Sequence, residues 1–269
     1  MFAINHAATA LIVKRRFPAA PMIGLLISVQ LMELLWVLFN YVGLEKTTTE
    51  PSVRSVSDIH LAFMPYSHSI ASAVVLAVIV WLIFAKKFQQ RAVGLALGAG
   101  VLSHLVLDLV THAPDISIAP GVNQPKFGLG LYSAAPVVAF VVEILYGVFC
   151  WWVYRGGGAL LAIIVLFNIA NLSLLSPAVP GPEEYLAGRP MLVVTVIARR
   201  SQRLSRLWDS LAGAPASSSS IEPNRGRSTG PSHPGFEKTS SLSHQLRFVR
   251  HYYDGSPRAN VIFEQGRNL

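Results

Sequence analysis

Long, unbroken apolar runs constrain this chain more than any other feature. Five of them come near the length of a bilayer crossing, at 21–42, 68–85, 92–110, 131–154 and 158–175. A hydrocarbon core about 30 Å thick takes about 20 residues of helix, and within it only a helix or a closed barrel can pair its own backbone groups. Only 13% of the residues are charged, about half the share found in soluble domains. We therefore predict an all-α fold, a polytopic integral membrane helical bundle with about five transmembrane helices.

Basic residues in the loops predict the orientation. Lys and Arg gather before the first run, between the second and third, and after the fourth, whereas the loops at 43–67 and 111–130 hold few. The positive-inside rule then places the N-terminus of this multi-pass membrane protein in the cytoplasm and those two loops outside. The apolar stretch 4–13 is too short to cross, so it predicts an interfacial or re-entrant helix.

The chain changes character near residue 198. An apolar segment that begins at Met191 stops at Arg199 after about eight residues, which are too few to cross. Residues 199–269 are rich in Ser, Pro, Gly and Arg, with 11 Lys and Arg against 5 Asp and Glu. We predict a transmembrane domain over 1–198 and a low-complexity, disordered basic tail over 199–269, which is either solvated or touches anionic headgroups.

The stretch SHLVLDLVTHAPD, residues 103–115, carries the densest group of ionisable side chains. At about 100° per residue, Asp108, His112 and Asp115 lie about 40°, 80° and 20° from His104 on a helix, so they share one face. His104 and Asp108 are one turn apart, the spacing at which two side chains converge on a metal ion, although a buried His to Asp hydrogen bond is the alternative. His112 and Asp115 are nearer the helix end, where a second ion, a water or a substrate can bind.

A second polar group precedes the 68–85 run. It consists of Asp58, His60 and the sequence PYSHS over 65–69, on the same predicted side as the end of the 92–110 run. His68 can then face the His104 and Asp108 pair, while Ser67 is expected to cap the helix.

Two carboxylates lie deep in apolar runs. Burying Glu33, Glu143 and Asp108 together as charges would cost roughly 8–10 kcal/mol on insertion scales. We therefore expect each of them to be protonated, paired or bound to a cation.

Several of these features together resemble a family of bacterial multi-span membrane proteins described as metal-dependent hydrolases. The resemblance covers about residues 1–198 and rests on His6, an acidic residue within SVQLMELLW, the PYSHS box, and SHLVLDLVTHAPD followed by GLGLYSAAP. It implies a location in a bacterial inner (plasma) membrane, a bound divalent metal and a distant similarity to zinc-dependent phospholipases. The ligands that it implies are His6, Glu33, His68, His104 and Asp108.

This chain departs from the family pattern in two places. Family members often have Asp where Glu33 stands, and they continue apolar where this chain turns Arg-rich. The predicted topology raises a separate conflict, because it puts His6 on the cytoplasmic side, away from an outward-facing site, unless the 4–13 segment re-enters the membrane.

The function that these features favour is metal-dependent hydrolysis at one membrane face. A divalent ion, zinc or manganese, held by His and carboxylate groups activates water for attack on an ester or phosphoester. His112 or Asp115 is then the general base or orients another group. Because the predicted site lies at a membrane face, membrane lipids are its expected partners and its substrate is expected to be lipid-like or a phosphoester. No nucleic acid is expected to bind.

Two other functions are open to the sequence. One is an ion- or proton-coupled transporter that uses Glu33, Asp108 and Glu143 as its ion path. The other is a non-catalytic membrane protein whose polar residues only hold helices together.

Overall fold

The computed structural model describes residues 1–179 and 181–212, so the tail predicted over 199–269 lies outside the described residues from 213 onward. The described part is mostly helical. Its α-helices are α1 (Ala3–Arg16), α2 (Met22–Val29), α3 (Leu31–Tyr41), α4 (Ile70–Leu82), α5 (Arg91–Thr111), α6 (Leu131–Ala134), α7 (Pro136–Tyr154), α8 (Gly158–Ile169), α9 (Leu172–Leu175) and α10 (Pro190–Ala212). Single helical turns cover Val56–Asp58, Ile83–Lys87 and Pro182–Leu186.

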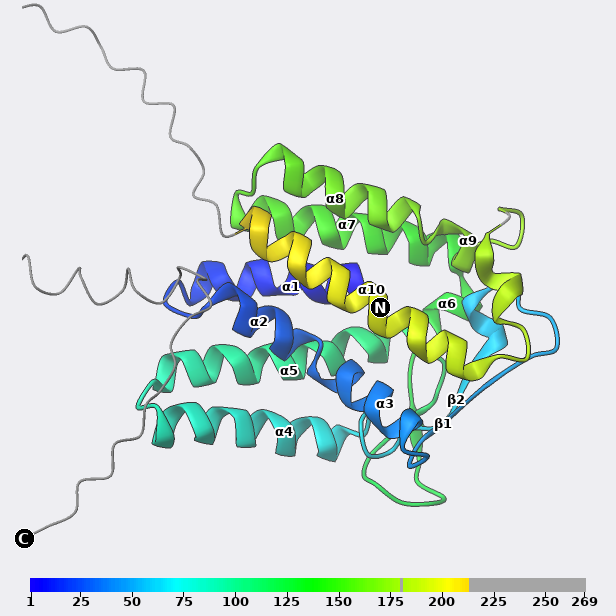
Figure 1. The fold of residues 1–269 in the computed structure, drawn as a ribbon, viewed down its shortest axis with the longest axis horizontal. Coiled ribbons are helices and arrows are strands. Elements are labelled where there is room, and N and C mark those ends of the chain that lie inside the picture. Colours follow the sequence, from blue (N-terminus) through cyan, green and yellow to red (C-terminus); the bar gives the residue numbers. More distant parts are fainter. Residues whose placement is uncertain (180, 213–269) are drawn as a thin grey trace, which may run out of the picture. The chain divides into compact units, whose positions relative to one another are not determined.

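Two short hairpins form in the loops. Strand β1 (Lys46–Thr49) pairs antiparallel with β2 (Ile59–Phe63), and β3 (Ile116–Ser117) pairs antiparallel with β4 (Lys126–Phe127). The β1–β2 hairpin lies beyond the end of the helices at the right of Figure 1. The site described below lies at this end of the bundle.

The predicted fold class, a polytopic membrane helical bundle, is confirmed. Among the described residues, three helices are long and apolar enough to cross a membrane: Ile70–Lys87, Arg91–Thr111 and Pro136–Tyr154. The pair α2 and α3 makes a fourth span if it is counted as one helix with a 53° bend. The run predicted as a fifth span at 158–175 breaks after Ile169, which leaves α8 with only 12 residues.

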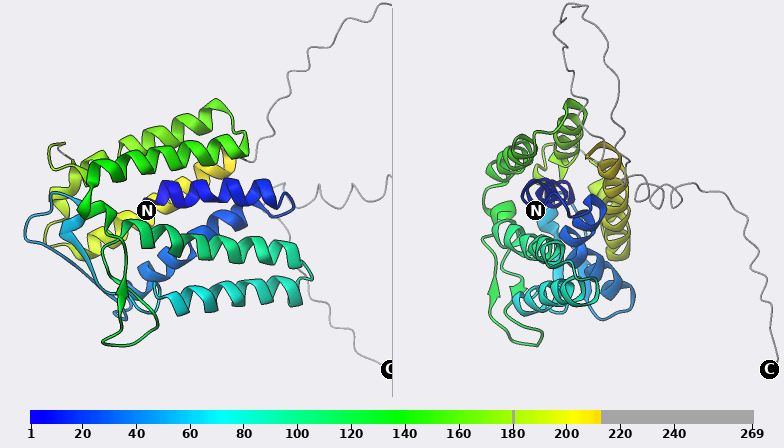
Figure 2. Two further views of the ribbon diagram at one scale, coloured as in Figure 1. Left: turned by 180° about the vertical axis from the view of Figure 1, so that it is seen from behind. Right: turned by 90° about the vertical axis from the view of Figure 1, so that its left-hand side faces the viewer.

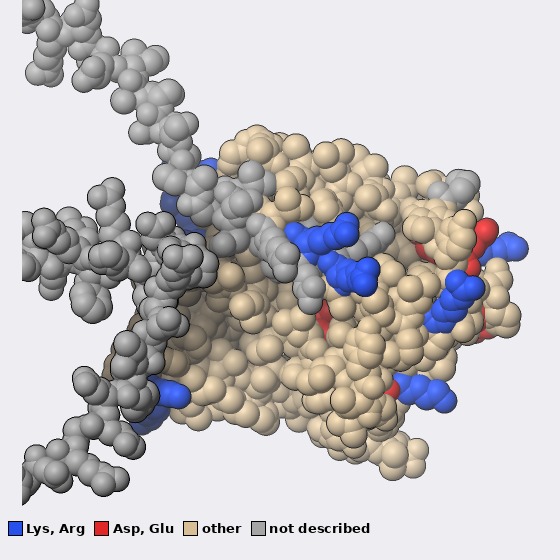
Figure 3. Space-filling model, in the orientation of Figure 1, with Lys and Arg blue, Asp and Glu red and all other residues tan. Residues whose placement is uncertain are grey.

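The outer surface of the bundle suits lipid. Val75 on α4, Val106 on α5 and Leu145 on α7 are each more than half exposed, although they lie in the most apolar helices. Figure 3 shows charged side chains near the ends of the bundle and over α10, with uncharged surface between them. On α5 the apolar Leu102 and Val106 are exposed, whereas His104 and Asp108 are buried on the inner side.

Helix α1 lies in the middle of the bundle. Its residues from Ile4 to Leu11 are all buried, and Figure 2 shows it enclosed by the other helices. An interfacial position for 4–13 does not fit this burial, and the re-entrant alternative stays a prediction. The basic C-terminal end of α1 at Arg16 lies at the same end of the bundle as the C-terminal ends of α4 and α7 (Figure 1). The first residues of α1 therefore lie toward the opposite end of the bundle. They lie at the site, away from the basic end of the helix, and the side of the membrane on which each end lies stays a prediction.

Helix α10 continues past residue 198 to Ala212, so the change in composition does not end the helix. Arg199 and Arg203 are exposed on it. Beyond Ala212 the predicted disordered tail stays a prediction.

Close packing of α7 against α1 and α8 requires glycine at 147. A Cβ atom there would lie 2.6 Å from Ile164 Cγ2 and 2.7 Å from Asn5 Oδ1. We expect Gly147→Val to lower the stability of the detergent-solubilised protein by about 1–3 kcal/mol, measured by thermal unfolding, because overpacking forces the helices apart. Gly158→Ala is the control, since a Cβ there meets no atom within 4 Å. Equal midpoints for the two variants would contradict this account of the packing.

Candidate metal centre

The break between α2 and α3 prepares one side of the site. At Gln30 the backbone leaves helical geometry, with φ −108° and ψ 3°. Such a break releases carbonyl groups from the regular helical pattern. The Val29 carbonyl oxygen lies 2.7 Å from Nδ1 of His104, which donates to it. Glu33 follows in the first turn of α3.

Helix α5 supplies the central pair. His104 and Asp108 are both about 1% exposed, and Nε2 of His104 lies 3.0 Å from Oδ2 of Asp108. This contact lacks hydrogen-bond geometry, so the buried Nε2 atom has no hydrogen-bond partner. A nitrogen in this state has a lone pair free for another ligand.

Two more donors complete a compact set. His68 Nε2 lies 3.7 Å from Asp108 Oδ2 and 3.8 Å from Glu33 Oε2, and the same Glu33 atom lies 3.9 Å from His104 Nε2. In a tetrahedral site with bonds of about 2.0–2.1 Å, ligand atoms are about 3.3 Å apart. Three of the four separations are longer than that, but Glu33, His68 and His104 each offer a ligand atom within 4.8 Å of the others, and Asp108 contacts both imidazoles, so this set could hold a divalent metal ion.

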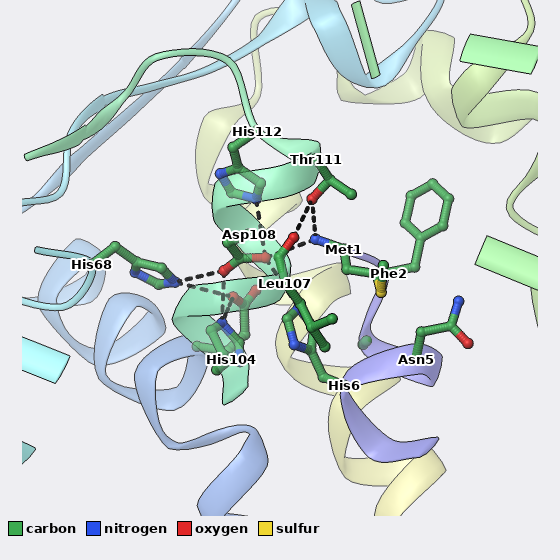
Figure 4. A network of polar contacts seen from close by, with 12 residues as sticks. Met1, Phe2, Asn5, His6, His68, His104, Leu107, Asp108, Thr111 and His112 are labelled. Carbon is green, nitrogen blue, oxygen red and sulfur yellow. Dashed lines mark hydrogen bonds and ion pairs between the residues drawn. The ribbon is translucent and has the colours of Figure 1, made fainter. Parts of the chain in front are cut away.

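His6 reaches the other oxygen of Asp108. Its Nε2 atom lies 3.1 Å from Asp108 Oδ1, and its ring stacks on that of His104 with 3.9 Å between centroids. His6, His104 and Asp108 form a second group of potential ligands that overlaps the first. The conflict between His6 and the predicted topology disappears because α1 starts beside α5. Figure 4 shows the imidazoles converging on Asp108, with the Met1 amino group 2.7 Å from Oδ1.

The ionisable face predicted for 103–115 ends earlier than expected. Helix α5 stops at Thr111, and His112 already has an extended backbone with ψ 150°. Asp115 therefore lies beyond the helix rather than on its face. The two side chains still meet, with His112 Nδ1 3.5 Å from Asp115 Oδ1 and His112 Nε2 3.5 Å from Asp108 Oδ1.

Three predicted polar residues have other positions or partners. Ser67 does not cap α4, because Ser69 does so and accepts from the backbone N–H of Ser72. Asp58 accepts from backbone groups of the turn around Ser55. His60 pairs with Glu50 at 2.7 Å on the exposed hairpin, and it lines the cavity described below without contacting the clustered donors.

Glu45 is a buried residue that the sequence analysis did not single out. Its Oε1 accepts from the backbone N–H groups of Tyr66 and Ser67, and its Oε2 accepts from the Ser67 hydroxyl. Burial raises the pKa of its carboxyl, and the hydrogen bonds from Ser67 and Tyr66 oppose that shift. Burial, with a contribution from His104, lowers the pKa of His68 well below its usual range. No local motif marks Glu45, since it lies 22 residues from Ser67.

Glu143 belongs to a separate polar network. It is fully buried and accepts from the Tyr132 hydroxyl, the Asn5 amide and the Phe2 backbone N–H. Asn5 also bonds to Asn168 of α8. Glu143 therefore links α1 to α6, α7 and α8, and it is not among the clustered ligand candidates.

A cavity of about 650 Å³ opens beside the cluster. One end is lined by His6, Glu33, His68, Asp108, His112 and Asp115. The remainder is lined mostly by apolar side chains of α1, α8, α9 and α10, including Ile4, Phe167, Leu174, Val193, Val196 and Ile197. Its size and mixed lining are typical of small-molecule sites.

The comparisons with known proteins support the membrane assignment. Residues 60–178 match the model of a family described as YdjM inner membrane protein, a stretch that holds His68, His104 and Asp108 but not His6 or Glu33. Together with the apolar helices, this match supports a bacterial family of membrane proteins and identifies a protein of the inner membrane, as predicted. No curated protein and no solved structure matches the chain. The description of the family names no activity.

Proposed function

We propose that this protein is a membrane-bound metal-dependent hydrolase whose divalent cation is held by Glu33, His68, His104 and Asp108. The observation that carries the proposal is the convergence of two imidazole nitrogens and two carboxylate oxygens from three separate segments. Zinc suits a tetrahedral set of this kind, and manganese is the alternative because half of the donors are oxygen. His6 is a further ligand candidate, because its Nε2 atom contacts Asp108 and its ring stacks on that of His104.

A divalent cation in this position supplies Lewis-acid activation of water and of an ester or phosphoester oxygen. His112 is the proposed general base, because it is partly exposed at the cavity wall and lies beside Asp108. Asp115 faces the other ring nitrogen of His112, where it orients the imidazole and stabilises its protonated form.

The cavity supports a lipid-like substrate with an ester or phosphoester bond. Its polar end contains the proposed ligands, and its apolar length along α8 to α10 can take an alkyl chain. A substrate drawn from the surrounding membrane lipids would meet both parts at once.

Purified protein in detergent should hydrolyse p-nitrophenyl esters or phosphodiesters that carry a dodecyl chain, and do so only with zinc or manganese present. We expect His112→Gln to lower this rate about 10²-fold at unchanged metal content, because it removes a proton acceptor but no proposed ligand. Glu50→Gln is the control, since Glu50 is an exposed carboxylate of the hairpin and does not line the cavity. The proposal would be ruled out if the wild-type protein hydrolysed every probe, with either metal, no faster than the His104→Ala variant does.

A further inference from the structure

The buried carboxylate of Glu45 is connected to the proposed metal ligand His68 through one hydroxyl group. The Ser67 Oγ atom lies 2.6 Å from Glu45 Oε2 and 2.8 Å from Nδ1 of His68. Glu45 is 4% exposed, and its hydrogen bonds go to Tyr66 and Ser67 rather than to a proposed metal ligand. It can therefore act on the site only through Ser67 and His68.

The direction of these two hydrogen bonds fixes the position of a proton. A serine hydroxyl has one proton, and a carboxylate can only accept. Ser67 therefore donates to Glu45, and its oxygen accepts from Nδ1–H of His68. In a neutral imidazole the other nitrogen is then unprotonated, and this Nε2 atom is the one that faces Glu33 and Asp108. A metal ion needs this lone pair.

His104 reaches the same protonation state by a simpler route. Its Nδ1 donates to the Val29 carbonyl, which can only accept, so no other group is needed to fix its tautomer. The Ser67 hydroxyl differs from a carbonyl because it can turn and donate to Nδ1 instead. That reversal would put the proton of His68 on Nε2, where it blocks metal binding.

We propose that Glu45 is a positioning residue, which sets the tautomer of His68 through Ser67 and so makes His68 a metal ligand. This inference rests on the proposed metal centre. Glu45→Gln is a sharp test because the amide has nearly the same shape as the carboxylate. The backbone N–H groups of Tyr66 and Ser67 hold the amide oxygen toward themselves, which turns the NH₂ group toward Ser67 Oγ. The hydroxyl then loses its acceptor at residue 45, and we expect it to donate to His68 instead, which reverses the tautomer.

We expect Glu45→Gln to weaken zinc binding about 10- to 100-fold, measured by competition with a chromophoric chelator. In a His68→Ala background the same substitution should have no effect on zinc affinity, because the relay then ends at Ser67. Glu50→Gln is the control, since it makes the same change at an exposed carboxylate of the β1–β2 hairpin. An unchanged affinity, or an equal loss in both backgrounds, would overturn the inference.

A second measurement separates this inference from the proposed function. The ¹⁵N chemical shifts of the His68 ring in the metal-free protein report which nitrogen carries the proton, and we expect Nδ1–H in the wild type and Nε2–H in Glu45→Gln. If the wild type binds no zinc, the proposed function fails while the ring shifts still test the role of Glu45. The same tautomer in both proteins would refute the relay even where zinc binds.

Discussion

Replacing His104 and Asp108 together by alanine is expected to remove the divalent metal from the purified protein. Apparent binding free energies of about 10–16 kcal/mol for four-ligand zinc sites correspond to about 3 kcal/mol per ligand, or roughly 10²-fold in affinity each. Loss of two of the four proposed donors should therefore weaken binding roughly 10⁴-fold. Elemental analysis of dialysed protein measures this directly, and hydrolysis should fall to background in the same variant.

The matched control removes a His and carboxylate pair on the β1–β2 hairpin, outside the proposed ligands. His60 and Glu50 are 2.7 Å apart, but both are about half exposed on the hairpin. Their double alanine variant should keep the full metal content. The milder pair His104→Gln with Asp108→Asn preserves side-chain volume and guards against a variant that fails to fold. Equal metal in wild type and in both site variants would end the metal proposal.

Local spacing was sufficient to predict the centre of the site. His104 and Asp108 are one helical turn apart, so their meeting required only that 92–110 be helical. The polar box before α4 was also informative, since His68 faces that pair as predicted. The precise ends of the helix were less accessible. Sequence periodicity continued to Asp115, but the chain turns at His112 and leaves Asp115 outside the helix.

Features that depend on distant contacts could not be predicted from the sequence. The stretch 4–13 is too short to cross a membrane, and only the surrounding helices show that it fills the middle of the bundle. The run at 158–175 is apolar overall, yet Asn168 turns inward to bond with Asn5, and α8 ends one residue later. Glu45 meets Ser67 only because the β1–β2 hairpin brings the two segments together.

The position of Glu143 bears on the transporter alternative. An ion path would need Glu33, Asp108 and Glu143 to share a route, and the first two do line the cavity. Glu143 is instead fully buried among amide and hydroxyl donors that come from α1, α6 and the N-terminal residues. Its contacts are those expected of a residue that holds helices together.

Glu143→Leu should therefore destabilise the bundle by about 2–4 kcal/mol, because the Tyr132 hydroxyl and the Phe2 N–H lose their buried acceptor. Unfolding in mixed micelles of increasing dodecyl sulfate content measures the loss. Glu143→Gln keeps the shape and one acceptor oxygen, so it should retain most of the stability.

The same two variants separate a structural carboxylate from a transporting one. In proteoliposomes we expect no proton or sodium flux from the wild type, and metal content and hydrolysis in Glu143→Gln should equal those of the wild type. A flux that the wild type shows and Glu143→Gln lacks would instead favour the carrier. The glutamine variant decides between them because it removes the ionisable group while keeping an acceptor oxygen for Tyr132 and Phe2, and of these contacts only the bond from the Asn5 amide is lost. The leucine variant removes all three of these hydrogen bonds.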